Sequence, residues 1–214
     1  MATEYRFPAG RLMVFAKAPV AGSVKTRLIP LLGVQGATRF YARICGYCIA
    51  LAVRAGVAPV QLYCDPDAAH PFFAQLAHQY GPELRRQEGE GLGERMHQAF
   101  ESALAQAKYG VLIGSDLPGL STALLQEAFS ALEDGCDAVI APAEDGGYVL
   151  LGLRVSSAAL FNDMVWSRGD VFAETCRRMD GLGWDYRVLE KQWDVDWPQD
   201  WYRLRHEGLL ANQK

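Results

Sequence analysis

Residues 14–33, VFAKAPVAGSVKTRLIPLLG, begin with an apolar run that is typical of a buried strand and then break into proline, glycine and serine. Lys25 and Arg27 follow at once, before apolar residues resume. A strand, a loop and a helix in this order form the repeating unit of parallel α/β sheets. The formal net charge of the chain is −4, so two cations in its first such loop indicate a local purpose.

The same alternation of strand and helix patterns continues along the chain. Strands are expected at residues 12–16, 60–64, 84–87, 109–114, 138–141, 148–153 and 186–190, and helices at residues 35–55, 68–80, 93–107, 122–134, 170–182 and 198–206. Continuous apolar strands suit a largely parallel sheet that is covered on both faces. The pattern predicts an α/β sandwich with right-handed crossovers, formed by one domain over residues 1–214. In such sheets, ligands bind where the strands end.

The composition is that of an ordinary globular protein. Half of the 214 residues are hydrophobic and 21% are charged. The negative net charge, without any block of lysine or arginine, argues against binding to nucleic acid or to an anionic membrane. No apolar run approaches the roughly 18 residues of a membrane helix, and the first residues lack the apolar core of a signal peptide. We therefore expect the protein in the cytoplasm.

The five cysteines include a CGYC sequence at Cys45 and Cys48. A thioredoxin-type redox pair follows a strand and opens a helix, whereas this pair lies inside the helix expected at residues 35–55. Cysteine is commonly a small buried residue. The position favours a structural role over a redox role.

The loop after the first strand has the residues of an anion site. Gly22 and Ser23 allow a turn whose backbone N–H groups converge, and Arg27 can bind a phosphate through two hydrogen bonds. Val24 stands where a P-loop needs the glycine that precedes its lysine. A solvated basic turn is the alternative, but the place behind the first core strand favours a phosphate-binding loop.

Two acidic segments could hold a metal ion. Asp116, in IGSDLPGL, ends the strongest strand, where it could bind Mg²⁺ or merely start a turn. Asp194 and Asp196, in DVDWPQD, share a face if the chain is extended there. Asp196 could instead cap the following helix, with Gln199 completing a capping box. The residues alone leave both alternatives open.

Two further segments that contain glycine are less specific indicators of a binding site. In PAEDGGYVLLG, Asp145 and the next glycine suit a hairpin turn, and two successive glycines also allow close approach of a ligand. In GEGLGERM, residues 89–96, Glu94 replaces the last glycine of a dinucleotide-binding motif, so a turn beside a nucleotide base fits better. The histidines lack zinc spacing, and the serines lack the context of a hydrolase nucleophile.

The motifs together resemble those of a known family. FAKAPVAGSVKTRL, GLGERM, GSDLP, PAEDGGYVLLGL, the WS at residues 166–167 and DVDWPQDW are similar to the motifs of the DUF2064 family, which is described as radical-SAM/selenodomain-associated transferases. That family belongs to the nucleotide-diphospho-sugar transferase (GT-A) superfamily and is similar to the 2-phospho-lactate and molybdenum-cofactor guanylyltransferases. The resemblance spans residues 12–201 in order. It implies a three-layer GT-A sandwich with a mostly parallel mixed sheet.

The resemblance also implies three sets of site residues. Nucleotide-binding residues would be Ala16, Lys17, Gly22, Ser23, Lys25, Arg27, Gly91 and Ser115, of which Lys25 and Arg27 would act in catalysis together with Asp116. Asp116 and Asp196, the latter in a D-x-P-x-D arrangement, would hold Mg²⁺ or Mn²⁺. Glu144, Asp145, Gly146, Gly147 and Trp166 would face the acceptor.

The function implied is that of a Mg²⁺-dependent transferase with a nucleotide substrate. The first expectation is nucleotidyl transfer from an NTP to a small phosphorylated or hydroxylated acceptor, with release of pyrophosphate. Glycosyl transfer from a nucleotide-sugar is the alternative, disfavoured because GSDLP contains one acid and not a D-x-D pair. A nucleotide-sensing module without catalysis is a third hypothesis. In each of these functions, Lys25 and Arg27 of the first loop would neutralise the phosphates of the nucleotide, a ligand that is more acidic than the protein itself. The oligomeric state is not indicated.

Overall fold

The computed structural model describes residues 4–166 and 168–208, and every strand and helix expected from the sequence is present. The strands are β1 (Gly10–Lys17), β2 (Val60–Asp65), β3 (Glu83–Arg86), β4 (Tyr109–Ile113), β5 (Ala138–Pro142), β6 (Tyr148–Leu153) and β7 (Tyr186–Val188). The helices are α1 (Ile29–Arg54), α2 (Pro71–Tyr80), α3 (Leu92–Leu104), α4 (Thr122–Glu133), α5 (Val171–Gly181) and α6 (Pro198–His206). Two short 3₁₀ helices, η1 (Thr26–Leu28) and η2 (Ala158–Leu160), were not expected.

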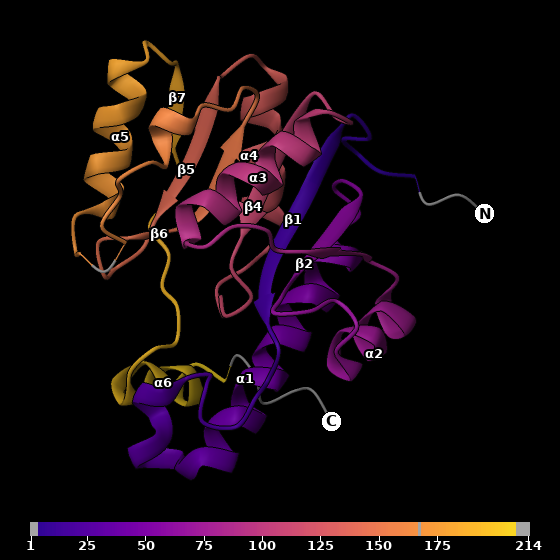
Figure 1. The fold of residues 1–214 in the computed structure, drawn as a ribbon, viewed down its shortest axis with the longest axis vertical. Coiled ribbons are helices and arrows are strands. Elements are labelled where there is room, and N and C mark those ends of the chain that lie inside the picture. Colours follow the sequence, from indigo (N-terminus) through magenta and orange to yellow (C-terminus); the bar gives the residue numbers. More distant parts are fainter. Residues whose placement is uncertain (1–3, 167, 209–214) are drawn as a thin grey trace.

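The strands form one mixed sheet in the order β3-β2-β1-β4-β6-β5-β7 (Figure 1). The pairs of β1 with β2, β1 with β4, β2 with β3, and β5 with β7 are parallel. β6 runs antiparallel to both of its neighbours. The expectation of a mostly parallel mixed sheet is confirmed. That residues 1–214 form a single domain stays a prediction, and its outermost residues lie outside the described part.

Helices cover both faces of the sheet because β1 alternates its side chains between them. Leu12 and Val14 belong to a buried cluster with residues of α1, α2 and α4. Met13 belongs to a second cluster, with residues of α3 and α5. The chain is therefore a three-layer α/β sandwich, as the resemblance implied.

One end of α1 differs from the expectation. The helix was expected from residue 35, but it begins at Ile29, with Pro30 in its first turn. Gly33, at φ 69° and ψ 165°, interrupts the helical backbone with a kink. A left-handed φ costs glycine no steric energy, so the residues before the kink form a separate turn that the periodicity could not reveal.

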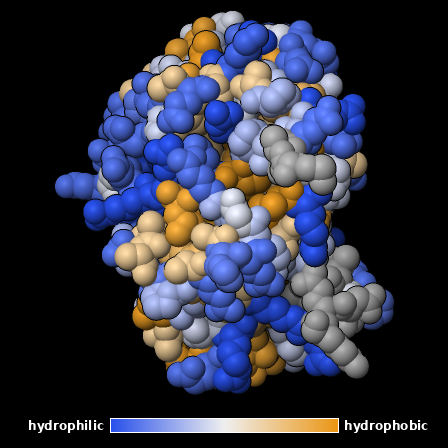
Figure 2. Space-filling model, turned by 90° about the vertical axis from the view of Figure 1, so that its right-hand side faces the viewer, coloured by the Kyte–Doolittle hydropathy of each residue, from blue (hydrophilic) through white to orange (hydrophobic). Residues whose placement is uncertain are grey.

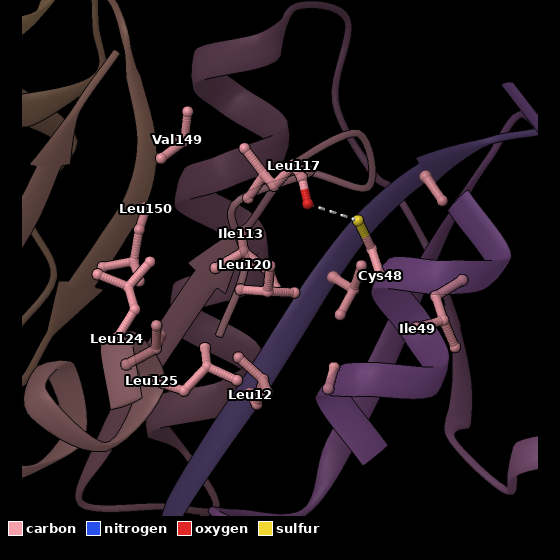
Figure 3. Close-up of a cluster of buried hydrophobic side chains, with 14 of the residues drawn as sticks. Leu12, Cys48, Ile49, Ile113, Leu117, Leu120, Leu124, Leu125, Val149 and Leu150 are labelled. Atoms are coloured by element: carbon pink, nitrogen blue, oxygen red, sulfur yellow. Dashed lines mark hydrogen bonds between the residues drawn. The ribbon is translucent and has the colours of Figure 1, made fainter. Parts of the chain in front are cut away.

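The CGYC segment lies inside α1, as predicted, and its two cysteines are buried free thiols. The Cys48 thiol donates a hydrogen bond to the carbonyl oxygen of Leu117, with 3.4 Å between sulfur and oxygen (Figure 3). Leu117 directly follows Asp116 in the loop after β4. The thiol thus ties α1 to a loop of the candidate site, which supports a structural role.

The described residues include no helix with the length and apolar character needed to cross a lipid bilayer. Figure 2 shows hydrophilic side chains over much of one side of the molecule, with apolar residues gathered near its middle.

Candidate active site

The site lies at the carboxyl ends of β1 and β4, where ligands bind in sheets of this kind. The loop after β1 carries Lys25, and the loop after β4 carries Asp116. The segment between β7 and α6 brings Asp196 to the same place. Three parts of the chain that are distant in sequence therefore supply the charged groups of one site.

Lys25 connects the two predicted metal ligands. Its Nζ lies 2.6 Å from Oδ2 of Asp116 and 2.8 Å from Oδ1 of Asp196. Burial by itself would lower the pKa of Lys25, whose side chain is only 5% exposed, but the two carboxylates outweigh burial and raise it. The ammonium group is therefore charged. The Lys25 backbone adopts the left-handed conformation, φ 46° and ψ 44°, which is sterically unfavourable for a residue with a Cβ.

Arg27 approaches Asp196 from the other side. Its Nη1 lies 2.7 Å from Oδ2 of Asp196, and its guanidinium stacks on the ring of Trp197 at 4.6 Å from the centroid. Burial by itself would raise the pKa of Asp196, but the charges of Lys25 and Arg27 prevail and lower it. Asp196 is thus held as a carboxylate between two cations.

Asp194 is a third acid of this site, and it was absent from the predicted ligand pair. One carboxylate oxygen of each of Asp116, Asp194 and Asp196 lies within 4.8 Å of the others. Three hard oxygen donors at this spacing fit Mg²⁺ or Mn²⁺. Burial, together with the charges of Asp116 and Asp196, raises the pKa of Asp194 from its ordinary 3.8 to about 7. When Asp194 is ionised, the three carboxylates outnumber the two paired cations, Lys25 and Arg27, which favours a bound cation.

The alternative in which Asp196 caps α6 with help from Gln199 is wrong. Asp200 caps the start of α6 instead. Its Oδ2 accepts hydrogen bonds from the backbone N–H of Asp196 at 3.0 Å and from that of Trp197 at 2.6 Å. The Asp196 carboxylate turns to Lys25 and Arg27 instead. Because Asp200 satisfies the start of the helix, Asp196 remains available for the site.

A cavity of about 430 Å³, here called the Lys25 cavity, opens beside these charges. Its lining includes six residues predicted to bind the nucleotide, namely Ala16, Lys17, Ser23, Lys25, Arg27 and Ser115. Gly22 and Gly91 are not among the lining residues. Gly22 has a φ of 82° in the turn before Ser23, and Gly91 immediately precedes α3. These two glycines shape the backbone around the cavity.

Tyr41 and Gln87 are among the lining residues of the Lys25 cavity that sequence reasoning missed. The Tyr41 hydroxyl, from α1, accepts a hydrogen bond from the Lys17 backbone N–H at 2.8 Å and lies 3.3 Å from Oγ of Ser115. The Gln87 amide donates to the carbonyl oxygens of Ala16 and Tyr63, at 3.3 and 2.9 Å. Gln87 directly follows β3, so the rule that ligands bind at strand ends could have identified it; Tyr41 left no such signal.

A second cavity of about 410 Å³, here called the Trp166 cavity, adjoins the first. Three predicted acceptor residues line it, namely Asp145, Gly147 and Trp166. Glu144 turns away and forms an ion pair with Arg203 of α6 at 3.0 Å. Gly146 is needed for backbone packing, since a Cβ there would collide with the carbonyl oxygen of Gly169. Ser167, part of the WS motif, lies outside the described residues.

The two cavities meet at the charged cluster. Arg27, Asp116 and Asp196 line both of them, and Asp194 lines the Trp166 cavity. A molecule in either cavity would therefore face the same carboxylates. This arrangement suits two ligands that react with each other across a shared charged centre.

The solved structures that share this fold include the following three. A candidate nucleotide-diphospho-sugar transferase from Desulfovibrio desulfuricans G20 has 29% sequence identity and a TM-score of 0.82, with 96% of this chain and 98% of that chain covered. A nucleotidyl transferase from Methanothermobacter has 17% identity and a TM-score of 0.64 over 95% and 99% of the two chains. Rv0371c of Mycobacterium tuberculosis H37Rv, in complex with manganese, has 17% identity and a TM-score of 0.54 over 92% and 98%.

Among curated proteins, none matches the sequence. Residues 48–168, more than half of the chain, match the family described as "Uncharacterized protein conserved in bacteria (DUF2064)". This segment includes the loop that carries Asp116 and the residues from Glu144 to Trp166. With a fold shared by nucleotide-using transferases, the chain belongs to the DUF2064 family.

Proposed function

We propose that this chain is a nucleotidyltransferase that depends on a divalent metal ion. It transfers the nucleotidyl group of an NTP to a small acceptor and releases pyrophosphate. One observation carries the proposal: Lys25 lies between Asp116 and Asp196, and these two carboxylates line both cavities. A transfer between two substrates needs its charged centre at such a junction. The names of the relatives from Desulfovibrio and Methanothermobacter support a transferase that uses a nucleotide.

In this proposal the triphosphate occupies the Lys25 cavity, whose lining includes Lys17, Lys25 and Arg27. Three cations in one cavity of an acidic protein match the charge of a triphosphate. Arg27 binds phosphate oxygens through its planar guanidinium, and Lys25 acts as a point charge near the α-phosphate. The loop thereby stabilises the negative charge that develops during transfer.

Asp116, Asp194 and Asp196 would hold Mg²⁺ or Mn²⁺. When bound, such an ion offsets charge on the phosphate oxygens and orients them for displacement. The manganese complex of Rv0371c, a protein of the same fold, supports a divalent ion. Asp194 was not part of the predicted ligand pair, and its inclusion here rests on the geometry of the three carboxylates.

The acceptor occupies the Trp166 cavity, so its attacking oxygen and the nucleotide meet across the carboxylates. The acceptor oxygen forms a bond with the α-phosphorus, and the bond between that phosphorus and the pyrophosphate oxygen breaks. No side chain of the protein has to act as a nucleophile. The work of the chain is positioning and charge stabilisation.

Glycosyl transfer remains the second candidate, favoured by the name of the Desulfovibrio relative. The sequence argument against it was the single acid of GSDLP, but Asp194 and Asp196 form a D-x-D pair elsewhere in the chain. The number of acids therefore does not distinguish the two reactions. The cations of the Lys25 cavity favour a triphosphate. A nucleotide-sensing module is disfavoured because binding alone does not require three clustered carboxylates.

Identification of the released products tests the proposal. The purified protein is incubated with Mg²⁺, each of the four NTPs and a panel of small acceptors, and pyrophosphate and nucleoside diphosphate are measured in parallel. We expect pyrophosphate from one NTP, dependent on the metal ion. Nucleoside diphosphate released from nucleotide-sugars, with no pyrophosphate from any NTP, would reject nucleotidyl transfer and support glycosyl transfer.

A further inference from the structure

The walls of the Trp166 cavity are largely apolar, in contrast to its charged end. Phe15, Met96, Leu112, Tyr148, Val149 and Trp166 contribute to them. Met96, Leu112 and Val149 are almost completely buried, at 3%, 7% and 8% exposure. These side chains come from β1, α3, β4 and β6 and from the segment before α5. An apolar cavity of this kind binds a ligand by removing its apolar surface from water.

The shape of this cavity is fixed by its packing. The rings of Tyr148 and Trp166 meet edge to face at 6.3 Å. Gly93, at the start of α3, lets Trp166 pack closely, because a Cβ there would lie 2.8 Å from the Phe161 carbonyl oxygen and 3.0 Å from the indole. The glycine-rich GLGERM motif thus serves the wall of this cavity. Two aromatic rings held in this way suit a flat or branched apolar group.

The charges that line this cavity are predominantly negative. Asp116, Asp145, Asp194 and Asp196 face it. Its cationic lining residues within the described chain are Arg27, which is paired with Asp196, and Arg168, which lies 3.2 Å from Asp170 and is 65% exposed. Arg27 offsets Asp196 and Asp170 offsets Arg168, so a divalent ion would still leave one of the three remaining lining carboxylates, those of Asp116, Asp145 and Asp194, without a cation that lines the cavity. A phosphate group on the acceptor would therefore meet like charge.

We propose that the acceptor is a hydroxy compound with an uncharged, apolar, ring-like or branched body, and that phosphate monoesters are excluded. This inference rests on the proposed function and narrows its acceptor. In the transfer, the hydroxyl oxygen bonds to the α-phosphorus while the bond from phosphorus to the pyrophosphate oxygen breaks. The hydroxyl proton passes to a carboxylate of the cavity, for which Asp145 is placed. The products are a nucleotidyl ester of the alcohol and pyrophosphate.

A matched pair of probes tests the inference by binding alone. Saturation-transfer NMR is recorded on the full-length protein with Mg²⁺, with and without α,β-methylene NTPs, using 2-phenylethanol and 2-phenylethyl phosphate as probes. We expect transfer to the ring protons of the alcohol and binding at least about tenfold weaker for the phosphate. Equal or tighter binding of the phosphate, or no transfer to either probe, would overturn the inference.

Two variants test whether the weaker binding of the phosphate probe arises in the Trp166 cavity. Leu92 is 46% exposed and lines this cavity where it adjoins the Lys25 cavity, so Leu92→Lys adds a cation without disturbing the core; the affinity of this variant is measured with the α,β-methylene NTP bound, which occupies the Lys25 cavity. We expect this variant to bind the phosphate probe more tightly than the unmodified protein. Val34→Lys is the matched control, since Val34 is also an exposed apolar residue, at 42%, and lines neither cavity. An unchanged phosphate affinity in Leu92→Lys, or an equal gain in Val34→Lys, would contradict the assignment.

The proposed function is tested separately by the thermal shift of the protein with Mg²⁺ and each NTP, without any acceptor. Loss of the alcohol preference while an NTP still binds rejects only the acceptor class. Absence of binding by every NTP rejects the proposed function itself. The two failures are therefore distinguishable.

Discussion

The Lys25 ammonium lies 2.6 Å from a carboxylate oxygen of Asp116, although the two residues are 91 positions apart in the chain. The same ammonium contacts Asp196 at 2.8 Å. Lys25 therefore occupies oxygens that a metal ion would use, and it acts as the counter-ion of the acids. A divalent ion held by these oxygens would compete with Lys25 for them, and Lys25 also lines the Lys25 cavity.

This competition predicts that Lys25→Met binds Mn²⁺ more tightly than the unmodified protein, while binding NTP more weakly. The substitution removes a cation from the ligand oxygens and from the phosphate site at once. Calorimetric titration with Mn²⁺ and with Mg²⁺·NTP measures both affinities. Lys17→Met is the control, because it removes a cation of the same cavity, and in the described part of the chain only Lys25 and Arg27 pair with these acids. Unchanged or weaker Mn²⁺ binding in Lys25→Met would contradict the competition.

Asp116→Asn and Asp196→Asn are expected to fold and to lose pyrophosphate release and Mn²⁺ binding. An amide keeps a hydrogen-bond acceptor for Lys25 but is a much poorer metal ligand than a carboxylate. Asp200→Asn, the same change four residues beyond Asp196, should keep turnover, because the amide oxygen can still accept the backbone hydrogen bonds of Asp196 and Trp197 and Asp200 lines neither cavity. Its cost should appear in stability, at about 0.3–1 kcal/mol, because the first turn of α6 loses a negative charge. Full activity in both site variants would reject the metal assignment.

The raised pKa of Asp194 predicts a dependence of stability on pH. Its pKa is about 7 in the folded protein and 3.8 ordinarily, so between these values the folded state binds more protons than the unfolded state. The free energy of unfolding of the metal-free protein should therefore fall as pH rises from about 4 to about 7. Chemical denaturation with EDTA at pH 5 and pH 8 measures this. Asp194→Asn should show a smaller decrease, and an identical decrease would contradict the assignment to Asp194.

Much of this arrangement could be predicted because it follows from local patterns. Apolar runs located the strands, and the rule that ligands bind at strand ends selected Lys25 and Asp116. The contacts that could not be predicted join distant segments. The Tyr41 hydroxyl contacts Ser115, which is 74 positions away in the chain. Arg203 forms an ion pair with Glu144, 59 positions away, and so holds Glu144 away from the acceptor site. No local pattern encodes such pairs.

The segment DVDWPQD, residues 194–200, shows that even within a single motif the roles of the residues could be predicted only in part. The alternation of Asp194 and Asp196 correctly indicated a shared face. Capping and metal binding require the same oxygens, however, and the sequence could not decide which acid serves which purpose. The decision depends on Asp200, which caps α6, and on Lys25 and Arg27 of the loop after β1, which lie beside Asp196. Only the packing of the β1 loop against this segment resolves the competition.

Arg27→Gln should weaken NTP binding by about tenfold, since hydrogen bonds to charged groups contribute roughly 1.5–3 kcal/mol. The side chain is 53% exposed, and exposed ion pairs contribute about 0–1 kcal/mol, so the melting temperature without ligand should hardly change. Trp197→Ala separates charge from positioning: it leaves the guanidinium in place and removes only the ring on which it stacks. We expect a smaller loss of affinity in Trp197→Ala than in Arg27→Gln, measured by titration with Mg²⁺·NTP. Wild-type affinity in Arg27→Gln would show that the loop after β1 is an ordinary solvated turn and that the nucleotide binds elsewhere.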